Sequence, residues 1–194
     1  MVGLQLLPAP TWEKIENLPP AQILRSIVNP TPPPPGPSSK QQSSILLHGP
    51  PVFPLAGISG KDAVAASIPG DCRPLGACTR KHVGVDYSAT PGWPVLAIEG
   101  GTVNEVKPDS PVGGILGIKS TSSDEIYRYV HLDRDSVRPF KVGDFVEKGS
   151  VIGLIGPTFL GSSGPHGHFE RYLNGQLDWK VHKHLEKAIK GPTP

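Results

Sequence analysis

The stretch V-G-D-F-V-E-K-G-S-V-I-G-L-I, residues 142–155, decides the fold class of this chain. Apolar residues alternate with other residues on both sides of Lys148-Gly149, and Gly143-Asp144 precedes the first run. Glycine-containing pairs of this kind mark tight turns, and alternation is typical of strands that bury one face. The stretch therefore predicts two strands that pair with each other as an antiparallel hairpin.

Short runs of the same character recur from about Ile45 onward, and most are bounded by glycine or polar residues. They lie at 83–89, 94–99, 102–107, 115–119, 125–132 and 166–172. Short connections favour antiparallel pairing between neighbours. Apolar residues at helical spacing then predict an amphipathic helix at about 179–190, with Asp178 as its N-cap. The expected fold is all-β, made mainly of antiparallel sheets, with one short C-terminal helix.

The composition divides the 194 residues into three parts. Residues 1–28 predict a small helical or extended segment that serves as an anchor. Residues 29–45 are a Pro/Ser-rich linker, for which an extended spacer and a disordered tail are both open interpretations. Residues 46–194 form the expected domain.

The charge and hydropathy patterns exclude some classes of partner. The formal net charge is +2, and Lys and Arg are scattered along the chain, so nucleic acid is not an expected partner. No apolar run has the length of a membrane span, and the N-terminal residues do not predict a signal peptide. A protein of this composition is expected to act without crossing a membrane itself.

Two His-x-His pairs have opposite geometries. His166 and His168 lie in G-P-H-G-H-F-E, a stretch that predicts a strand, where side chains at i and i+2 point to the same side. His182 and His184 lie in the predicted helix, where the same spacing places them on nearly opposite sides. The first pair is therefore suited to a common metal or substrate, and the second is interpreted as non-catalytic.

Two further segments supply groups of the same chemistry. His82 and Asp86 are four residues apart with valines between them, which favours a strand that presents both on one face. His131 lies between Val130 and Leu132, so alternation points it away from these two apolar neighbours. Catalytic zinc sites use three protein ligands and leave one position open, and histidine and aspartate are common ligands there.

Taken in order, these motifs resemble the lysostaphin/LytM-type zinc endopeptidases, which cut peptidoglycan peptides. The similarity is carried by His82-x-x-x-Asp86, by Y-V-H-L at 129–132 and by G-P-H-G-H-F-E at 164–170. It covers roughly residues 50–178 and extends to framework segments at 92–97, 100–103 and 142–149. The resemblance implies a barrel-sandwich-like LytM domain.

The resemblance also implies roles for individual residues. It makes His82, Asp86 and His168 the ligands of one zinc ion, with His131 and His166 as the catalytic histidines. Which of these two histidines is the general base stays open. The expected activity is hydrolysis of peptide bonds in peptidoglycan stem peptides or cross-links, and the bond itself is not predicted.

The setting of that activity is a second expectation. Because no secretion signal is predicted, a phage-encoded lysin is expected, either a component of the virion tail or an enzyme held in the host cytoplasm until lysis. Residues 1–45 would then contact other virion proteins. The alternative is a catalytically silent LytM-like module for binding or assembly, but all the metal-site positions are intact.

Three residues beside the motifs have two interpretations each. Tyr87 and Tyr129 either line a substrate groove or pack within strands, and packing is the preferred alternative for both. Glu170 shares the strand face of His168, so it either accepts a hydrogen bond from a ligand histidine or is a plain surface glutamate.

The segment before His82 contains the only two cysteines of the chain, Cys72 and Cys78. They either close a small loop as a disulfide or remain free thiols; their spacing does not favour a metal site. Arg73 and Arg80 both lie where family members often carry an arginine, and the sequence does not choose between them.

Overall fold

The computed structural model describes residues 51–58, 63–73, 77–160 and 162–190. The predicted anchor and the predicted linker lie outside the described residues. Within the described part of the chain, none of the helices combines the length and apolar character that crossing a membrane requires.

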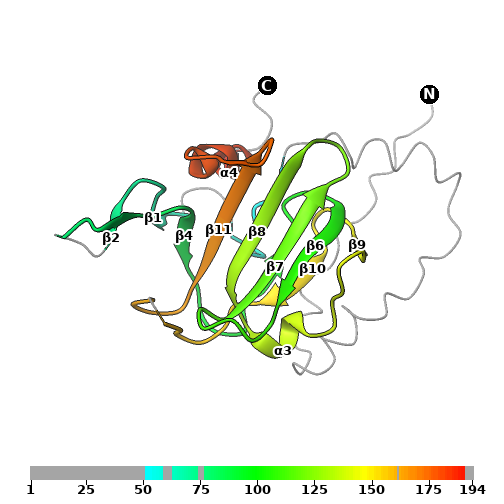
Figure 1. Ribbon diagram of the computed structural model, residues 1–194, viewed down its shortest axis with the longest axis horizontal. Helices are drawn as coiled ribbons and strands as arrows, with labels where there is room; N and C mark the ends of the chain where they lie inside the picture. Colours follow the sequence, from blue (N-terminus) through cyan, green and yellow to red (C-terminus); the bar gives the residue numbers. More distant parts are fainter. Residues whose placement is uncertain (1–50, 59–62, 74–76, 161, 191–194) are drawn as a thin grey trace, which may run out of the picture. The chain divides into compact units, whose positions relative to one another are not determined.

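One antiparallel sheet dominates the fold (Figure 1). In spatial order its strands are β1 (Ala65–Ser67), β4 (Val85–Ser88), β11 (His166–Leu173), β8 (Glu125–Leu132), β7 (Gly114–Ser120), β6 (Gly101–Lys107) and β9 (Phe145–Val146), and β12 (Gln176–Leu177) pairs with β11. The expected all-β, mainly antiparallel class is thereby confirmed. Strand β11 lies between β4 and β8, so the segments that carry the sequence motifs are neighbours in space.

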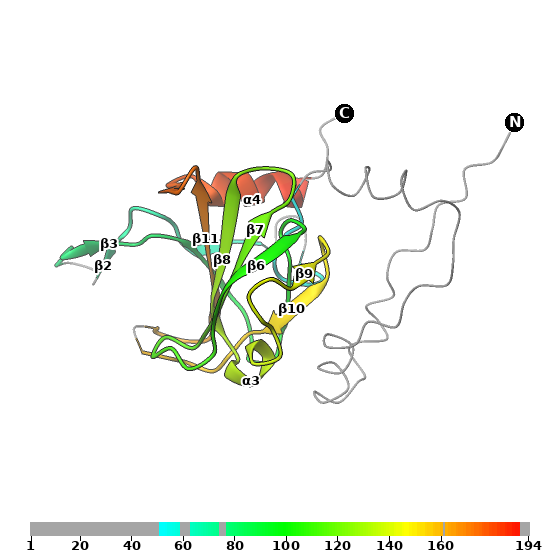
Figure 2. The same ribbon diagram turned by 45° about the vertical axis from the view of Figure 1, so that its right-hand side comes forward.

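The described residues also form two small sheets. One pairs β5 (Pro94–Leu96) with β10 (Val151–Leu154), and the other pairs β2 (Cys72–Arg73) with β3 (Arg80–Lys81). The β2–β3 pair projects from the side of the large sheet where β1 and β4 lie (Figure 2).

The core contains apolar side chains from both the large sheet and the β5–β10 pair. Leu116, Ile118 and Phe169 come from the large sheet, and Val95 and Ile152 come from the small one; all are fully buried. Each such side chain contributes about 1.5–3 kcal/mol relative to an exposed position. This packing gives the strands at the site a rigid base.

The predicted hairpin at 142–155 is wrong in its pairing, although both turns are present. Gly143 and Gly149 have positive φ, as their turns require. After the second turn, however, the backbone bonds to Ala97 and not back to Val146, with Gly149 N–H donating to the Ala97 carbonyl at 2.8 Å. β9 therefore pairs with β6, and β10 pairs with β5. Both partners are distant in sequence, so the local pattern does not predict them.

Among the described residues, two helices pack beside the sheet. The C-terminal helix α4 (Val181–Lys190) confirms the predicted helix and lies across one end of the sheet beside β11 (Figure 1). The Asp178 carboxylate accepts the Lys180 N–H at 2.9 Å, which caps the turn before α4. The sequence prediction missed the short helix α3 (Arg134–Val137), which Asp133 caps.

Candidate metal centre

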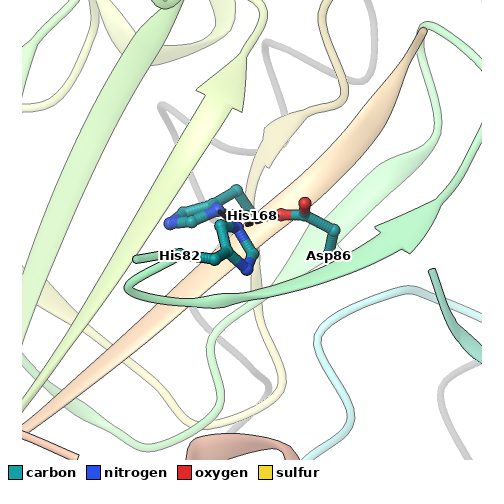
Figure 3. Close-up of side chains that lie close together, drawn as sticks. All are labelled: His82, Asp86 and His168. Atoms are coloured by element: carbon teal, nitrogen blue, oxygen red, sulfur yellow. Dashed lines mark hydrogen bonds and ion pairs between the residues drawn. The ribbon is translucent and has the colours of Figure 1, made fainter. Parts of the chain in front are cut away.

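Three residues, two from neighbouring strands of the sheet and one from the connection before β4, converge on one point (Figure 3). His168 lies on β11, Asp86 lies beside it on β4, and the two are register partners in the sheet. His82 comes from the connection between β3 and β4. All three are buried, and one potential ligand atom from each lies within 4.8 Å of the others.

The distances within this cluster are short. Asp86 Oδ1 lies 2.8 Å from His168 Nδ1 and 3.2 Å from His82 Nε2. The two ring nitrogens lie 3.1 Å from each other. Three atoms that can each offer a lone pair thus face the same small volume.

The opposite side of each histidine ring is held by an acceptor. His82 Nδ1 donates to the Ile68 carbonyl at 3.1 Å, and His168 Nε2 donates to a Glu170 carboxylate oxygen at 3.1 Å. Because a carbonyl and a carboxylate only accept, these bonds leave His82 Nε2 and His168 Nδ1 as the inward nitrogens that can act as ligands. Ligand histidines in metal sites typically have outer partners of this kind.

The two carboxylates also shape the charge of the cluster. Burial alone raises the pKa of Asp86, but the favourable interaction of its carboxylate with the rings of His168 and His82 outweighs burial and holds this pKa well below its usual range. Burial opposes charge on His168, yet its bonds to Asp86 and Glu170 raise its pKa. Burial likewise opposes the ionised form of Glu170, and the bond from His168 lowers its pKa to about 2. The site is therefore built to hold positive charge.

A divalent metal ion fits this donor set. Two imidazole nitrogens and one carboxylate oxygen form a ligand set suited to zinc, and catalytic zinc sites have three such protein ligands. The inward nitrogens are fixed by their outer partners before any ion binds.

His131 lies beside the cluster because of a β-bulge. Gly114 pairs with Leu132 and Leu116 pairs with Tyr129, so two residues of β8 face one of β7 at this point. His131 has φ of 64°, a left-handed conformation that non-glycine residues rarely adopt. Bulges and such conformations are frequent next to active sites, where they redirect a side chain.

The backbone and ring of His131 are both held. Its carbonyl accepts the Gly156 N–H at 2.9 Å, and its Nδ1 donates to the Val112 carbonyl at 2.7 Å. Burial lowers the pKa of His131 to about 4. The ring is therefore neutral near pH 7, and its Nε2 carries a free lone pair.

His166 approaches the cluster from the same strand face as His168. Its Nε2 lies 3.6 Å from Asp86 Oδ1, which agrees with the predicted same-side geometry of the His166 and His168 pair. Its Nδ1 donates to the Gly164 carbonyl at 2.8 Å, and the Ser162 hydroxyl lies 3.2 Å from the same nitrogen. The ring of His166 meets that of His131 edge to face.

The prediction that His82 and Asp86 share a strand is wrong. β4 begins at Val85, and His82 precedes it in an irregular connection that contains Gly84. A Cβ at Gly84 would lie 2.5 Å from His168 Nε2 and 2.7 Å from the Phe169 carbonyl oxygen. The absence of a side chain at this position lets the connection pass close to β11, which brings His82 to the cluster by a different route.

The groove prediction for the two tyrosines is also corrected. Tyr129 is fully buried, and its hydroxyl accepts the Ile98 N–H at 2.8 Å. Tyr87 is 3% exposed and packs edge to face on Phe53. Both point from their strands into the core, so neither side chain is available to a substrate.

The histidines of α4 take no part in the cluster. The group that could hold a metal, among the described residues, consists of His82, Asp86 and His168 alone. His184 Nε2 instead lies 3.0 Å from the Tyr127 hydroxyl, which joins α4 to the sheet.

The structure resolves several questions that the sequence left open. Glu170 is 3% exposed and contacts His168, so it is not a surface residue. Arg73 contacts Asp86 Oδ2 at 3.0 Å, whereas Arg80 is exposed on the adjacent strand. Cys72 and Cys78 form a disulfide. The sequence offered no signal for Ser162 as a neighbour of His166.

An antiparallel β domain with a buried His–Asp–His cluster and two adjoining histidines defines a metallohydrolase-type site. The chain belongs to Peptidase family M23, whose family model matches residues 80–178. It is 40% identical to lysostaphin of Staphylococcus simulans over 103 residues, which are 52% of this chain and 20% of lysostaphin.

Two further relatives support the same assignment. The chain is 33% identical to the peptidoglycan DD-endopeptidase ShyC of Vibrio cholerae over 107 residues, which are 55% of this chain and 24% of ShyC. The crystal structure of a zinc-containing peptidase from Vibrio cholerae matches with a TM-score of 0.54 and 27% identity, covering 67% of this chain and 38% of that one. The chain spans about a quarter or less of the length of these curated relatives.

Proposed function

We propose that this chain is a zinc-dependent endopeptidase that hydrolyses peptide bonds in the stem peptides or cross-links of bacterial peptidoglycan. The observation that carries the proposal is the convergence of His82 Nε2, Asp86 Oδ1 and His168 Nδ1, with two further histidines beside them. Membership of the M23 family and the similarity to a peptidoglycan DD-endopeptidase support the substrate class.

His82, Asp86 and His168 would hold the ion, and a bound zinc ion would supply a Lewis acid that polarises the scissile carbonyl. His131 and His166 act beside it. Each ring donates Nδ1–H to a backbone carbonyl, so each presents Nε2 to the substrate. In the neutral form one Nε2 accepts a proton from the attacking water; the other, when protonated, donates to the oxyanion or to the leaving amine.

A chelator and one substitution test this function together. The wild-type protein and a His168→Ala variant are run in a zymogram that contains purified cell walls, with and without a chelator. We expect the wild-type protein to clear the cell walls and His168→Ala not to clear them. The chelator should abolish clearing by the wild-type protein, and added zinc should restore it. Clearing that survives both the substitution and the chelator refutes the metal mechanism. A wild-type protein that binds zinc but clears nothing supports the alternative, a silent module for binding or assembly.

We further propose that the protein is phage-encoded, as a tail component or as a lysis enzyme. The Pro/Ser-rich residues 29–45 support a tether between the M23 domain, residues 46–194, and an anchor in residues 1–28 that contacts other virion proteins. Mass spectrometry of purified virions distinguishes the two settings. Peptides of this chain in the virions support the tail component, and their absence contradicts it.

A further inference from the structure

A second layer of residues surrounds two of the three clustered side chains, and it comes from the segment before His82. β2 pairs with β3 so that Arg73 lies opposite Arg80 and Cys72 opposite Lys81. The Cys72–Cys78 disulfide ties β2 to the chain just before β3. The residue next to this covalent tie, Arg73, reaches the cluster.

Arg73 binds the outer oxygen of Asp86. Its Nη2 lies 3.0 Å from Asp86 Oδ2 and 2.7 Å from the Ser67 hydroxyl oxygen. The side chains are largely shielded, with 24% of Arg73 and 10% of Asp86 exposed. The other oxygen, Oδ1, faces His82 and His168. Arg73 thus engages one carboxylate oxygen and leaves the other for the cluster.

The same segment also holds His82. The Asp71 carbonyl accepts the His82 N–H at 2.8 Å, and Gly70 N–H donates to the His82 carbonyl at 2.9 Å. The Asp71 carboxylate accepts from the Ser67 hydroxyl at 2.7 Å and from the Ile68 N–H at 2.9 Å. The Ile68 carbonyl in turn accepts from the His82 ring. Residues 67–73 therefore orient His82 and Asp86 together.

We propose that Arg73 is a positioning residue of the metal centre: it occupies Asp86 Oδ2 so that Asp86 offers a single oxygen to the ion, and the Cys72–Cys78 disulfide keeps Arg73 in place. This inference rests on the proposed role of Asp86 as a ligand. The Cys72–Cys78 disulfide, which lies outside the cluster, thereby supports the metal site through Arg73. Outer partners of metal ligands typically contribute 10–100-fold to metal affinity or activity.

The test uses the full chain loaded with Co²⁺, whose visible absorption bands report the number and kind of its ligands. The variants are Arg73→Ala, Arg73→Lys and the double variant Cys72→Ser/Cys78→Ser, with Arg80→Ala as the matched control on the same hairpin. Serine is used in place of reduction because free thiols are themselves metal ligands. Metal affinity is measured by competition with a chelator, and thermal unfolding of the metal-free proteins reports folding.

We expect Arg73→Ala to lose about 10-fold or more in metal affinity and to change the Co²⁺ spectrum, and the double serine variant to shift in the same direction. Arg73→Lys should restore part of the affinity, and Arg80→Ala should match the wild-type protein. Wild-type affinity and spectrum in a folded Arg73→Ala protein overturn the positioning role. An unchanged double serine variant overturns the role of the disulfide.

The same experiments distinguish failure of the proposed function from failure of the positioning role of Arg73. If the wild-type protein binds no Co²⁺ and clears no cell walls, both are wrong. If it binds metal and is active while Arg73→Ala is indistinguishable from Arg80→Ala, only the positioning role is wrong. If Arg73→Ala does not fold, Arg73→Lys takes its place in the comparison. The metal affinity of Arg73→Lys must then fall between that of the wild-type protein and that of the double serine variant.

Discussion

His131 and His166 meet edge to face with ring centroids 4.6 Å apart, and each donates its Nδ1–H to a backbone carbonyl. The two rings come from different strands, β8 and β11. Their Nε2 atoms are thus presented by fixed tautomers beside the same cluster. Because neither histidine belongs to the group that could hold a metal, we expect their roles to be separable from metal binding.

Substitution of either histidine tests this separation. His131→Ala and His166→Ala should each lower the turnover rate by about 100-fold or more, because a positioned acid or base contributes 10²–10⁴-fold. Metal content should stay at the wild-type level in both variants. Rates come from release of new amino groups from cell walls, and metal content from elemental analysis. Loss of the metal in either variant contradicts the division of roles.

Strand periodicity predicted the part of the site that depends on one strand. His166 and His168 are two residues apart on β11, and both approach Asp86 Oδ1. The same argument failed for His82, because the chain leaves strand geometry near Gly84 and reaches the cluster through a turn. Periodicity describes a continuous strand, and it contains no information on how a connection folds back.

The remaining differences are contacts between distant parts of the chain. The bulge that orients His131 forms only where β7 and β8 pair. The sequence of residues 142–155 predicts the turns but not which strands pair with β9 and β10. Arg73 and Glu170 are candidates on the sequence alone, but their partners depend on how β2 and β11 pack. Local sequence predicted the elements well, and tertiary pairing decided which side chains meet.

Glu170 offers a test of the outer layer around His168. Glu170→Gln keeps the size of the side chain but removes the negative charge that holds His168 Nε2–H, so metal affinity should fall about 10-fold. Glu105→Gln is the matched control, because Glu105 binds Arg128, as Glu170 does, and has no hydrogen bond to His168. Chelator competition measures both variants. Equal affinities in the two variants contradict the role given to Glu170.

Gly84 tests the close approach between the His82 connection and β11. In Gly84→Ala the new Cβ would lie 2.5 Å from His168 Nε2 and close to the Phe169 backbone, so something must shift. We expect weaker metal retention and a loss of about 1–3 kcal/mol in unfolding free energy. Gly164→Ala is the control, since a Cβ there meets nothing within 4 Å. Metal retention that falls equally in both variants argues against a specific contact at Gly84.

The two histidines of α4, His182 and His184, are predicted to have no role in metal binding. Replacing both His182 and His184 by alanine should leave zinc content unchanged, because α4 carries them away from the cluster and His184 bonds to Tyr127. His168→Ala should remove the metal under the same conditions. Elemental analysis of the purified proteins after dialysis makes the comparison. Loss of zinc from the double variant would contradict the non-catalytic interpretation of His182 and His184.

His184 also makes the stability of the protein depend on pH. Burial, with a smaller contribution from the nearby Arg171 charge, lowers its pKa to about 4 in the folded protein, whereas an unfolded chain has a histidine pKa of about 6.5. Between these values the unfolded chain binds more protons at this position. The stability that neutral His184 contributes is therefore present above about pH 6.5 and is lost as the pH falls toward about 4.

Comparison with His184→Gln isolates this contribution, since the acidic residues titrate in both proteins. Near neutral pH the wild-type protein should be more stable by about 1 kcal/mol, the typical contribution of one hydrogen bond. The difference in unfolding free energy should fall steadily below about pH 6.5 and reverse its sign as the pH approaches about 4, because a pKa shift of this size outweighs one hydrogen bond. Urea unfolding of both metal-free proteins across this range supplies the measurement. Two parallel stability curves would mean that His184 does not titrate with a lowered pKa in the folded protein.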